Sequence, residues 1–282
     1  MPELRIKCSS DDQLTFLYVL SPLGISWHLK QNMTMFHIAT VQKPAAQALS
    51  QDGLSLLSPA DLITTLELPD DWTQRWCLLA QAWHNLPPDA HLKDGGSYRQ
   101  RRHACFVQNL AAKTLTQTPH RAHWQPTDYN ALHGGFERWF DPVEPAVAEN
   151  HAWMDLLAGF GKLFARVQAV NEWFIEAHQF RIDTTNGVGR PTPEGAHRDG
   201  VNFVVVLLVA RHGVKGGETR VFDAHGPQGL RFVMHEPLTA LILDDARVIH
   251  ETTPIFPDHG DGEQGYRDTL VLTYRAGGFQ AP

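Results

Sequence analysis

The chain has few cysteines, no long apolar run and no excess of basic charge, and each absence removes a class of protein. Its three cysteines, Cys8, Cys77 and Cys105, lie far apart and form no CxxC pair. This spacing excludes a disulfide scaffold and a cysteine-based zinc finger, and it suits a reducing compartment. The longest apolar run, FVVVLLVA at 203–210, has the length of a strand and is too short to cross a bilayer.

The charge balance argues against a nucleic acid or a membrane as the partner. Lys and Arg total 24 against 31 Asp and Glu, which gives a net charge of −7. Such a chain is a poor electrostatic match for phosphates or an anionic membrane surface, so we expect a small-molecule partner. The chain begins MPELRIKCSSDD, with acidic residues where a signal peptide carries basic ones. The sequence therefore predicts a cytoplasmic protein, and it leaves the oligomeric state open.

Two segments carry the spacing of amphipathic helices. In residues 58–86, Ser58 and Pro59 resemble a helix N-terminus, and Trp and Leu residues then recur at three- and four-residue steps. Residues 145–173 keep the same apolar period. We therefore expect a helical N-terminal half.

The first residues look unlike the rest of the chain, and Met33 or Met35 is an alternative start. The sequence thus predicts an N-terminal extension over 1–34 and a single domain over 35–282.

After Trp173 the pattern changes to short runs of β-forming residues separated by turn residues. Seven such runs predict a sandwich or barrel, and the fold class is α+β, with the helical half packed against the β core. No GxGxxG, Walker or GxSxG motif supports a nucleotide or serine-hydrolase site. The predicted strands cover residues 175–183, 203–210, 218–222, 230–235, 239–244, 246–253 and 269–275.

A candidate metal site begins in EGAHRDGVNF, just before a buried-looking strand. His197 and Asp199 are two residues apart, so both side chains point the same way in an extended chain. His250 follows on a later strand, ARVIHETTPI. Two imidazoles and one carboxylate without a thiolate are the ligands of a non-haem Fe(II) site with an open coordination face. Zinc is a weaker alternative because HxxEH-type signatures are absent, and the HxD pair taken alone also fits a capped turn. We read Asp244-Asp245 as a turn outside the metal shell.

A candidate carboxylate-binding pair opens the last strand. Arg267 and Thr269 are two residues apart and share a face. A guanidinium binds a carboxylate through two hydrogen bonds, and a hydroxyl can add a third. Beside an open iron face, the pair suits a 2-oxo diacid that chelates the metal with its keto acid end. The alternatives are a salt bridge of Arg267 with Asp268 or Asp245, and Arg275 as the residue that binds the carboxylate.

Three segments of the C-terminal part resemble one enzyme family. PTPEGAHRDGVNFVVVLLVARHGVKGGETRVFD, LILDDARVIHETTPI and YRDTLVLTYR are similar to Fe(II)- and 2-oxoglutarate-dependent dioxygenases. This family includes bacterial L-isoleucine hydroxylases, other free-amino-acid oxygenases and stress- and biofilm-associated BsmA-type homologues. The resemblance implies a double-stranded β-helix (jelly-roll) core over about 174–276. It implies iron held by His197, Asp199 and His250, and 2-oxoglutarate bound by Arg267 with help from Thr269.

The resemblance also implies an activity. The protein would take Fe(II), 2-oxoglutarate and O2 and hydroxylate a small substrate, a free aliphatic L-amino acid. Two alternatives remain: an oxygenase acting on another metabolite or a protein side chain, and a non-catalytic stress- or biofilm-associated jelly-roll protein that binds a metal or ligand. For each candidate arginine, an ion pair or a solvated position is the competing interpretation. The candidate substrate-contacting residues are Arg99, Arg101, Arg181 and Glu218.

Overall fold

The computed structural model of the protein describes residues 43–129, 132, 134–258 and 264–282. The predicted extension over 1–34 therefore lies outside the described residues, and the domain boundary at residue 35 stays a prediction. Within the described ranges, no helix is long and apolar enough to span a membrane.

Short helices alternate with strands in the first part of this region. Ser58 begins the second helix as the sequence predicts, because its hydroxyl accepts a hydrogen bond from Asp61 N at 3.2 Å and Pro59 takes the first helical position. The helices are α1 (Ala45–Asp52), α2 (Pro59–Leu66), α3 (Trp72–Ala80), α4 (Pro145–Ala148) and α5 (His151–Ala165), with a 3-10 helix, η1 (Gln81–Asn85).

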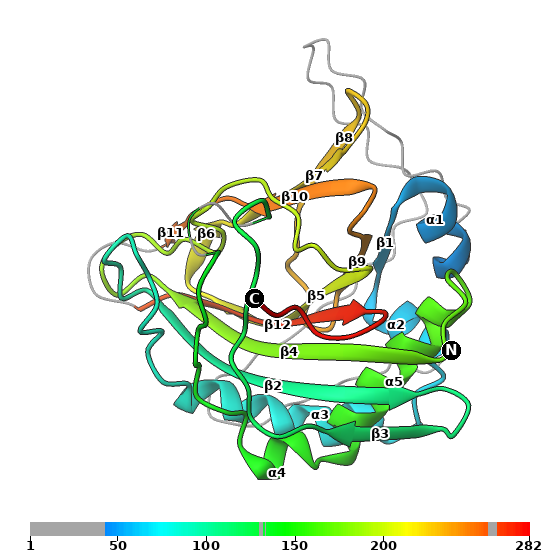
Figure 1. Cartoon of the computed structure of the whole chain (residues 1–282). Coiled ribbons are helices and arrows are strands. Elements are labelled where there is room, and N and C mark those ends of the chain that lie inside the picture. Colours follow the sequence, from blue (N-terminus) through cyan, green and yellow to red (C-terminus); the bar gives the residue numbers. More distant parts are fainter. Residues whose placement is uncertain (1–42, 130–131, 133, 259–263) are drawn as a thin grey trace, which may run out of the picture. The chain divides into compact units, whose positions relative to one another are not determined.

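The main sheet is antiparallel, with the strand order β1-β9-β5-β12-β4-β2-β3 (Figure 1). Its long central strands pair over nine to eleven residues, and a β-bulge between Asp268 and Thr269 shifts the register of β12 against β5. The strands are β1 (Leu54–Leu57), β2 (Arg99–Asn109), β3 (Thr114–Gln117), β4 (Glu172–Asp183), β5 (Phe203–His212), β9 (Ala240–Asp244) and β12 (Tyr266–Arg275).

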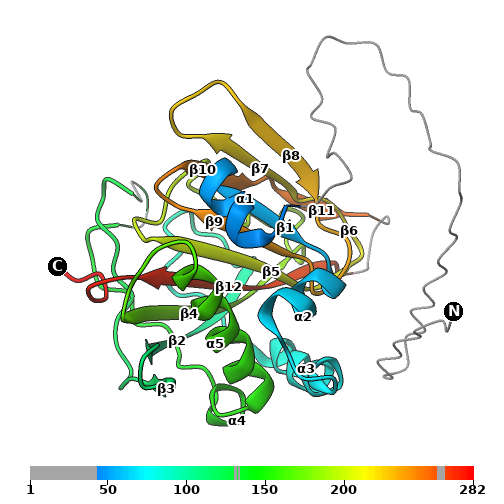
Figure 2. The same ribbon diagram turned by 90° about the vertical axis from the view of Figure 1, so that its right-hand side faces the viewer.

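Two smaller antiparallel sheets complete the β structure. One has the order β10-β7-β8 and the other pairs β11 with β6. Figures 1 and 2 show helices α2, α3 and α5 on one side of the main sheet and the sheet of β7, β8 and β10 on the other. The strands are β6 (Val214–Gly216), β7 (Glu218–Asp223), β8 (Gly229–Val233), β10 (Val248–Thr252) and β11 (Ile255–Pro257).

Side-chain alternation gives the main sheet two different faces. On β4, Ile175 and Ala177 belong to the large apolar cluster that includes the buried face of α5. Glu176 and His178 therefore point to the opposite face, toward the smaller sheets. On β12, Tyr274 packs on the helical side and donates a hydrogen bond to Leu157 O in α5 at 2.8 Å. The helices thus stabilise one face and leave the other face for chemistry.

The predicted elements are found with shorter helices. The predicted helix over 58–86 is divided into α2, α3 and η1, because Glu67 adopts a left-handed backbone with φ 54° and Pro69 follows it. The predicted helix over 145–173 ends at Ala165, and the remaining residues lead into β4. Each of the seven predicted strands overlaps an observed strand.

The N-terminal half is only partly helical, since it also contains β1, β2 and β3. Strand β2 lies inside the main sheet next to β4, so this half supplies part of the β core itself.

Candidate active site

The three predicted metal ligands come together between the sheets. His197 and Asp199 lie in the segment before β5, and His250 lies in the middle of β10. Asp199 places one carboxylate oxygen 3.9 Å from His197 Nε2 and the other 3.7 Å from His250 Nε2. One ligand atom from each of the three residues lies within 4.8 Å of the other two, so the group could hold a metal ion.

Hydrogen bonding and burial prepare the two imidazoles for a metal. His197 Nδ1 lies 2.9 Å from Gly195 O, so in the neutral imidazole Nδ1 carries the proton and Nε2 has a free lone pair. Burial, and then the charge of His197, lowers the pKa of His250 to about 3. Burial raises the pKa of Asp199 in the absence of a cation. A bound metal ion would offset the cost of burying the ionised Asp199 carboxylate. The donor set therefore fits a divalent transition metal.

Asp245 fixes the segment that carries Asp199. The carboxylate of Asp245 is fully buried and accepts hydrogen bonds from the backbone N–H groups of Asp199, Gly200 and Val201 at 2.9, 2.7 and 3.1 Å. The predicted turn at Asp244-Asp245 is thus also an anchor for the metal-site segment. Asp245 does not touch the site and acts by positioning Asp199.

Gln125 orients the Asp199 carboxylate from another direction. Gln125 Nε2 donates to Asp199 Oδ1 at 3.1 Å, and Arg138 Nη2 donates to Gln125 Oε1 at 2.8 Å. Sequence reasoning missed both residues, because the segment that holds them has no regular secondary structure and no motif.

Arg267 is buried, and no carboxylate of the described residues pairs with it. Its side chain is 3% exposed, and among the described residues its Nη2 has no hydrogen-bond acceptor. Burial, and then the charge of Arg211, lowers the pKa of Arg267 to about 10. Arg211 lies opposite Arg267 in the sheet register, and its buried Nη1 also lacks an acceptor within the described ranges. Two neighbouring guanidiniums with unused donors fit an anionic ligand such as a carboxylate.

The two salt-bridge alternatives for Arg267 are occupied elsewhere. Asp268 forms a bidentate pair with Arg181 at 2.7 and 2.6 Å, and Asp245 binds backbone amides. Thr269 is buried two residues along the same strand.

The paired strands β10 and β7 connect the candidate metal site with the Arg211–Arg267 pair. Two residues after His250 on β10 lies Thr252, which is opposite Thr219 of β7. Beyond Thr219 lies Gly217, where an added Cβ would be 3.0 Å from Arg211 Nη1 and 3.8 Å from Arg267 Cδ. The guanidinium pair therefore lies near the end of β7 that leads away from His250.

A cavity lies beside Asp199 and is lined by residues of β4, β12 and the C-terminal segment. Its apolar residues are Phe174, Val201 and Phe279, and its charged residues besides Asp199 are Glu176 and Arg275. Arg275 thus faces the cavity at one end of β12, while Arg267 is buried near the other end. The two arginines therefore belong to different sites.

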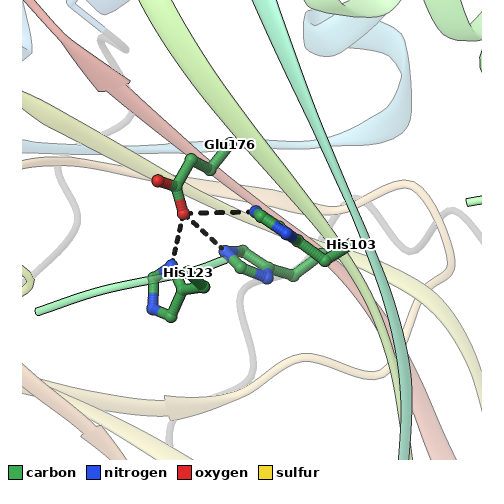
Figure 3. A group of neighbouring side chains, drawn as sticks. His103, His123 and Glu176 are labelled. Atoms are coloured by element: carbon green, nitrogen blue, oxygen red, sulfur yellow. Dashed lines mark hydrogen bonds and ion pairs between the residues drawn. The ribbon is translucent and has the colours of Figure 1, made fainter. Parts of the chain in front are cut away.

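Sequence analysis missed a second group of titratable residues, the Glu176 cluster, formed by His103, His123, Glu176 and His178. Glu176 Oε2 lies 3.3 Å from His103 Nε2 and 3.6 Å from His178 Nε2, and it contacts His123 Nδ1 (Figure 3). The donor types and spacing make this cluster a second group that could hold a metal ion. His103 and His178 are opposite each other in the β2–β4 register. A correct prediction of this strand pairing would have brought the two residues together.

The four predicted substrate-contacting residues all have protein partners. Arg99 pairs with Asp89 at 2.7 Å, and Arg181 pairs with Asp268. Glu218 binds Arg220 at 2.7 Å. Arg101 stacks on Phe140 and donates to His178 Nδ1 at 2.6 Å, which places it behind the Glu176 cluster. Contact of any of the four with a substrate stays a prediction.

An antiparallel β structure that carries two imidazoles and a carboxylate between its sheets is typical of the jelly-roll iron oxygenases. Residues 80–273 match the family model described as 2OG-Fe dioxygenase. The chain therefore belongs to the 2OG-Fe dioxygenase family, and it is a 2-oxoglutarate-dependent dioxygenase that uses Fe(II) and 2-oxoglutarate. No curated protein sequence matches the chain.

Solved structures agree with this family. A BsmA homologue from Methylobium petroleophilum PM1 is 55% identical, with a TM-score of 0.79 over 84% of this chain and 94% of that one. IDO from Bacillus thuringiensis is 16% identical, with a TM-score of 0.66 over 87% and 98% of the two chains. TqaL, an Fe(II)/α-ketoglutarate-dependent dioxygenase, is 19% identical, with a TM-score of 0.63 over 82% and 85%. The last two likenesses show the fold alone, which is consistent with a jelly roll.

Proposed function

We propose that the protein hydroxylates a free aliphatic L-amino acid, as an enzyme of the L-isoleucine-hydroxylase and BsmA-like type. In this proposal the metal ligands are His197, Asp199 and His250, and the co-substrate binds Arg267 with help from Thr269. The observation that carries the co-substrate assignment is the buried guanidinium of Arg267, whose Nη2 finds no acceptor among the described residues.

The protein groups bind and orient the reactants. The metal, when bound, supplies the activation of O2 that couples decarboxylation of 2-oxoglutarate to oxidation of a C–H bond. Gly195 O keeps the His197 ring in the tautomer that presents Nε2, and Asp245 holds the segment of Asp199 in place. Arg267 binds the distal carboxylate of the co-substrate and so fixes the direction of the keto acid end.

The residues that line the small cavity beside Asp199 support the choice of substrate. Its apolar residues suit an aliphatic side chain, while Glu176 and Arg275 offer one negative and one positive charge. A small molecule with both charges and an apolar side chain matches this lining. Because the cavity includes Asp199, a C–H bond of the substrate would lie close to the metal.

The experiment is anaerobic addition of Fe(II) and 2-oxoglutarate, followed by a panel of free L-amino acids. We expect a visible charge-transfer band from the chelate, a change of that band with aliphatic amino acids, and a product one oxygen heavier after O2 is admitted. The same panel as peptides tests action on a protein side chain. Absence of the band would contradict the co-substrate assignment, and a band that no free amino acid perturbs would contradict the substrate assignment.

A further inference from the structure

We propose that the Glu176 cluster is a recognition site for an ammonium group, with Glu176 binding the substrate's α-ammonium and Arg275 binding its α-carboxylate. This inference rests on the proposed function, because it assigns substrate groups to residues of the cavity beside Asp199.

Glu176 contacts three imidazoles through one oxygen, and the residue also lines the cavity. Oε2 is hydrogen-bonded to His123 Nδ1 and lies 3.3 Å from His103 Nε2 and 3.6 Å from His178 Nε2. The second oxygen points away from the labelled imidazoles (Figure 3). The contacts of Glu176 within the described residues all use Oε2, and Glu176 lines the cavity while being only 6% exposed. A cationic donor from a ligand in the cavity would pair with the other oxygen of this carboxylate.

The hydrogen-bond pattern favours a carboxylate held by imidazole donors over a second metal centre. Arg101 Nη2 donates to His178 Nδ1 at 2.6 Å, so a neutral His178 carries its proton on Nε2, facing Glu176. A metal held by Nε2 needs the lone pair of that nitrogen, which this tautomer of His178 does not offer. Gly195 O leaves the lone pair of His197 Nε2 available, whereas the donor at His178 Nδ1 does not. His178 is therefore poorly suited to bind a metal ion through Nε2.

The same bonds keep Glu176 ionised. Burial alone would raise the pKa of its carboxyl, but the electrostatic effect of His123 and the hydrogen bonds from His103, His123 and His178 hold that pKa well below its usual range. Burial also lowers the pKa values of the three imidazoles. The cluster thus surrounds one ionised carboxylate with three imidazoles, and the carboxylate belongs to a residue that lines the cavity.

Arg275 is placed to complete a binding site for a zwitterion. In the β12–β4 register, Thr273 is opposite Glu176 and Arg275 is opposite Phe174. Glu176 and Arg275 are therefore diagonal neighbours, roughly 7–8 Å apart. Both line the cavity, and no ion pair joins them in the described part of the chain. One Arg275 nitrogen, Nη1, is held by Gly278 O at 2.5 Å, which keeps the side chain in place.

An apolar surface next to these charges accounts for an aliphatic side chain. Phe174 and Phe279 meet edge to face, with ring centroids 5.1 Å apart, and Val201 lies on the same cavity. The arrangement assigns separate surfaces to the ammonium, the carboxylate and the side chain, which is how a free amino acid would be distinguished from one inside a peptide.

The test compares probes that lack one group at a time. The anaerobic Fe(II)–2-oxoglutarate complex is titrated with L-leucine, with 4-methylpentanoate, which lacks the ammonium, and with 3-methylbutylamine, which lacks the carboxylate. The dissociation constant is read from the charge-transfer band and from calorimetry. In the wild type, we expect loss of the ammonium to weaken binding about tenfold to hundredfold, as for other hydrogen bonds to charged groups. In Glu176→Gln, L-leucine and the analogue without the ammonium should bind with almost equal dissociation constants. Glu176→Asp should restore part of the difference between them.

The arginine and control variants make the outcome specific. Arg275→Gln should abolish the penalty for losing the carboxylate while keeping the penalty for losing the ammonium. Glu172→Gln, on the same strand and bonded to Asn109, should behave as the wild type. An intact band in Glu176→Gln shows that its fold and co-substrate site are preserved. If that variant does not fold, the Arg275→Gln and Glu176→Asp titrations decide the matter.

Three results would overturn the inference, and they are distinguishable from failure of the proposed function. L-leucine binding with an unchanged ammonium penalty in Glu176→Gln would reject the Glu176 assignment alone. A second equivalent of bound metal that persists in His197→Ala/His250→Ala and is lost in His103→Ala/His123→Ala would make the cluster a metal centre. If L-leucine leaves the wild-type band unchanged, L-isoleucine and L-methionine with their matching analogues are titrated in turn. Failure of all three amino acids would reject the amino-acid substrate together with this inference.

Discussion

His197 and His250 are joined by two reciprocal backbone hydrogen bonds, each N–H donating to the other's carbonyl oxygen at 3.0 Å. This isolated antiparallel bridge ties the segment before β5 to β10. The two ring centroids are consequently 4.7 Å apart. The spacing of the predicted ligands is therefore set by the backbone, and single ligand substitutions should leave it intact.

The first prediction follows for the three ligands. His197→Ala, Asp199→Ala and His250→Ala should each lose Fe(II) binding and the decarboxylation of 2-oxoglutarate, while circular dichroism stays that of the wild type. Metal content by mass spectrometry and succinate release check this. His225→Ala, in a turn, is the matched control. Normal Fe(II) binding by all three variants would show that the iron lies elsewhere.

The second prediction concerns Arg267. Removing its paired hydrogen bonds to a carboxylate should cost about 2–5 kcal/mol of 2-oxoglutarate binding, as for other buried charge pairs. Arg267→Ala should therefore raise the dissociation constant for 2-oxoglutarate steeply while Fe(II) affinity stays unchanged, and Thr269→Val should have a smaller effect. Calorimetry in the presence of Fe(II) without O2 measures both constants. Arg166→Gln, which alters an exposed pair with Glu67, is the control. An unchanged constant in Arg267→Ala would exclude this arginine from the co-substrate site.

A third prediction separates two adjacent aspartates. Asp245→Ala removes the acceptor of three backbone N–H groups around Asp199, so the segment should lose its fixed position. We expect Fe(II) affinity to fall at least about tenfold and thermal stability to decrease, because hydrogen bonds to a charged group contribute about 1.5–3 kcal/mol each. Asp244→Ala, whose carboxylate receives one backbone bond from Ala246, should lose far less Fe(II) affinity. Equal losses in the two variants would contradict the anchoring role of Asp245.

The fourth prediction is a pH dependence of stability. Burial lowers the pKa of His123 from 6.5 to about 4, so the unfolded chain binds more protons than the folded chain between these pH values. The free energy of unfolding should then fall with decreasing pH across this window, by about 1.4 kcal/mol per pH unit for each such imidazole. The pKa values of His103 and His178 are also lowered, which makes the dependence of the unfolding free energy on pH steeper. Denaturant titrations of the metal-free protein at pH 7, 6 and 5 measure it.

The comparison for this prediction uses a neutral substitute. His123→Asn keeps a donor toward Glu176 and removes one titrating group, so its stability should depend less steeply on pH than that of the wild type. His225→Asn should leave the slope unchanged. Equal slopes of the wild type and His123→Asn between pH 6.5 and 5 would show that His123 is not a buried neutral group.

The convergence of His197, Asp199 and His250 could be predicted from the sequence because its signal is local. His197 and Asp199 lie in one extended segment, and His250 lies on a strand whose apolar pattern is clear. The Glu176 cluster could not be predicted in this way. Its members come from β2, β4 and an irregular segment, and only the pairing of His103 with His178 across two strands brings the rings together. The role of Asp245 could not be predicted either, because its carboxylate accepts hydrogen bonds from backbone N–H groups more than forty residues earlier in the chain.

The helices show a different limit of prediction from the sequence, which concerns their boundaries. The apolar period over 58–86 predicts helical structure correctly, but it does not contain the break at Glu67, where a residue other than glycine takes a left-handed conformation. Tertiary packing of Trp72 and Trp76 against the rest of the apolar cluster determines where the chain turns.

The alternation along β4 has a consequence for how this enzyme can change. Phe174 and Glu176 line the cavity beside Asp199, whereas Ile175 and Ala177 belong to the large apolar cluster that keeps the protein folded. Selectivity and folding are therefore encoded at interleaved positions of one strand. A library that randomises only the first set should yield altered selectivity with few unfolded members, and an insertion of one residue in this strand should destroy both properties together.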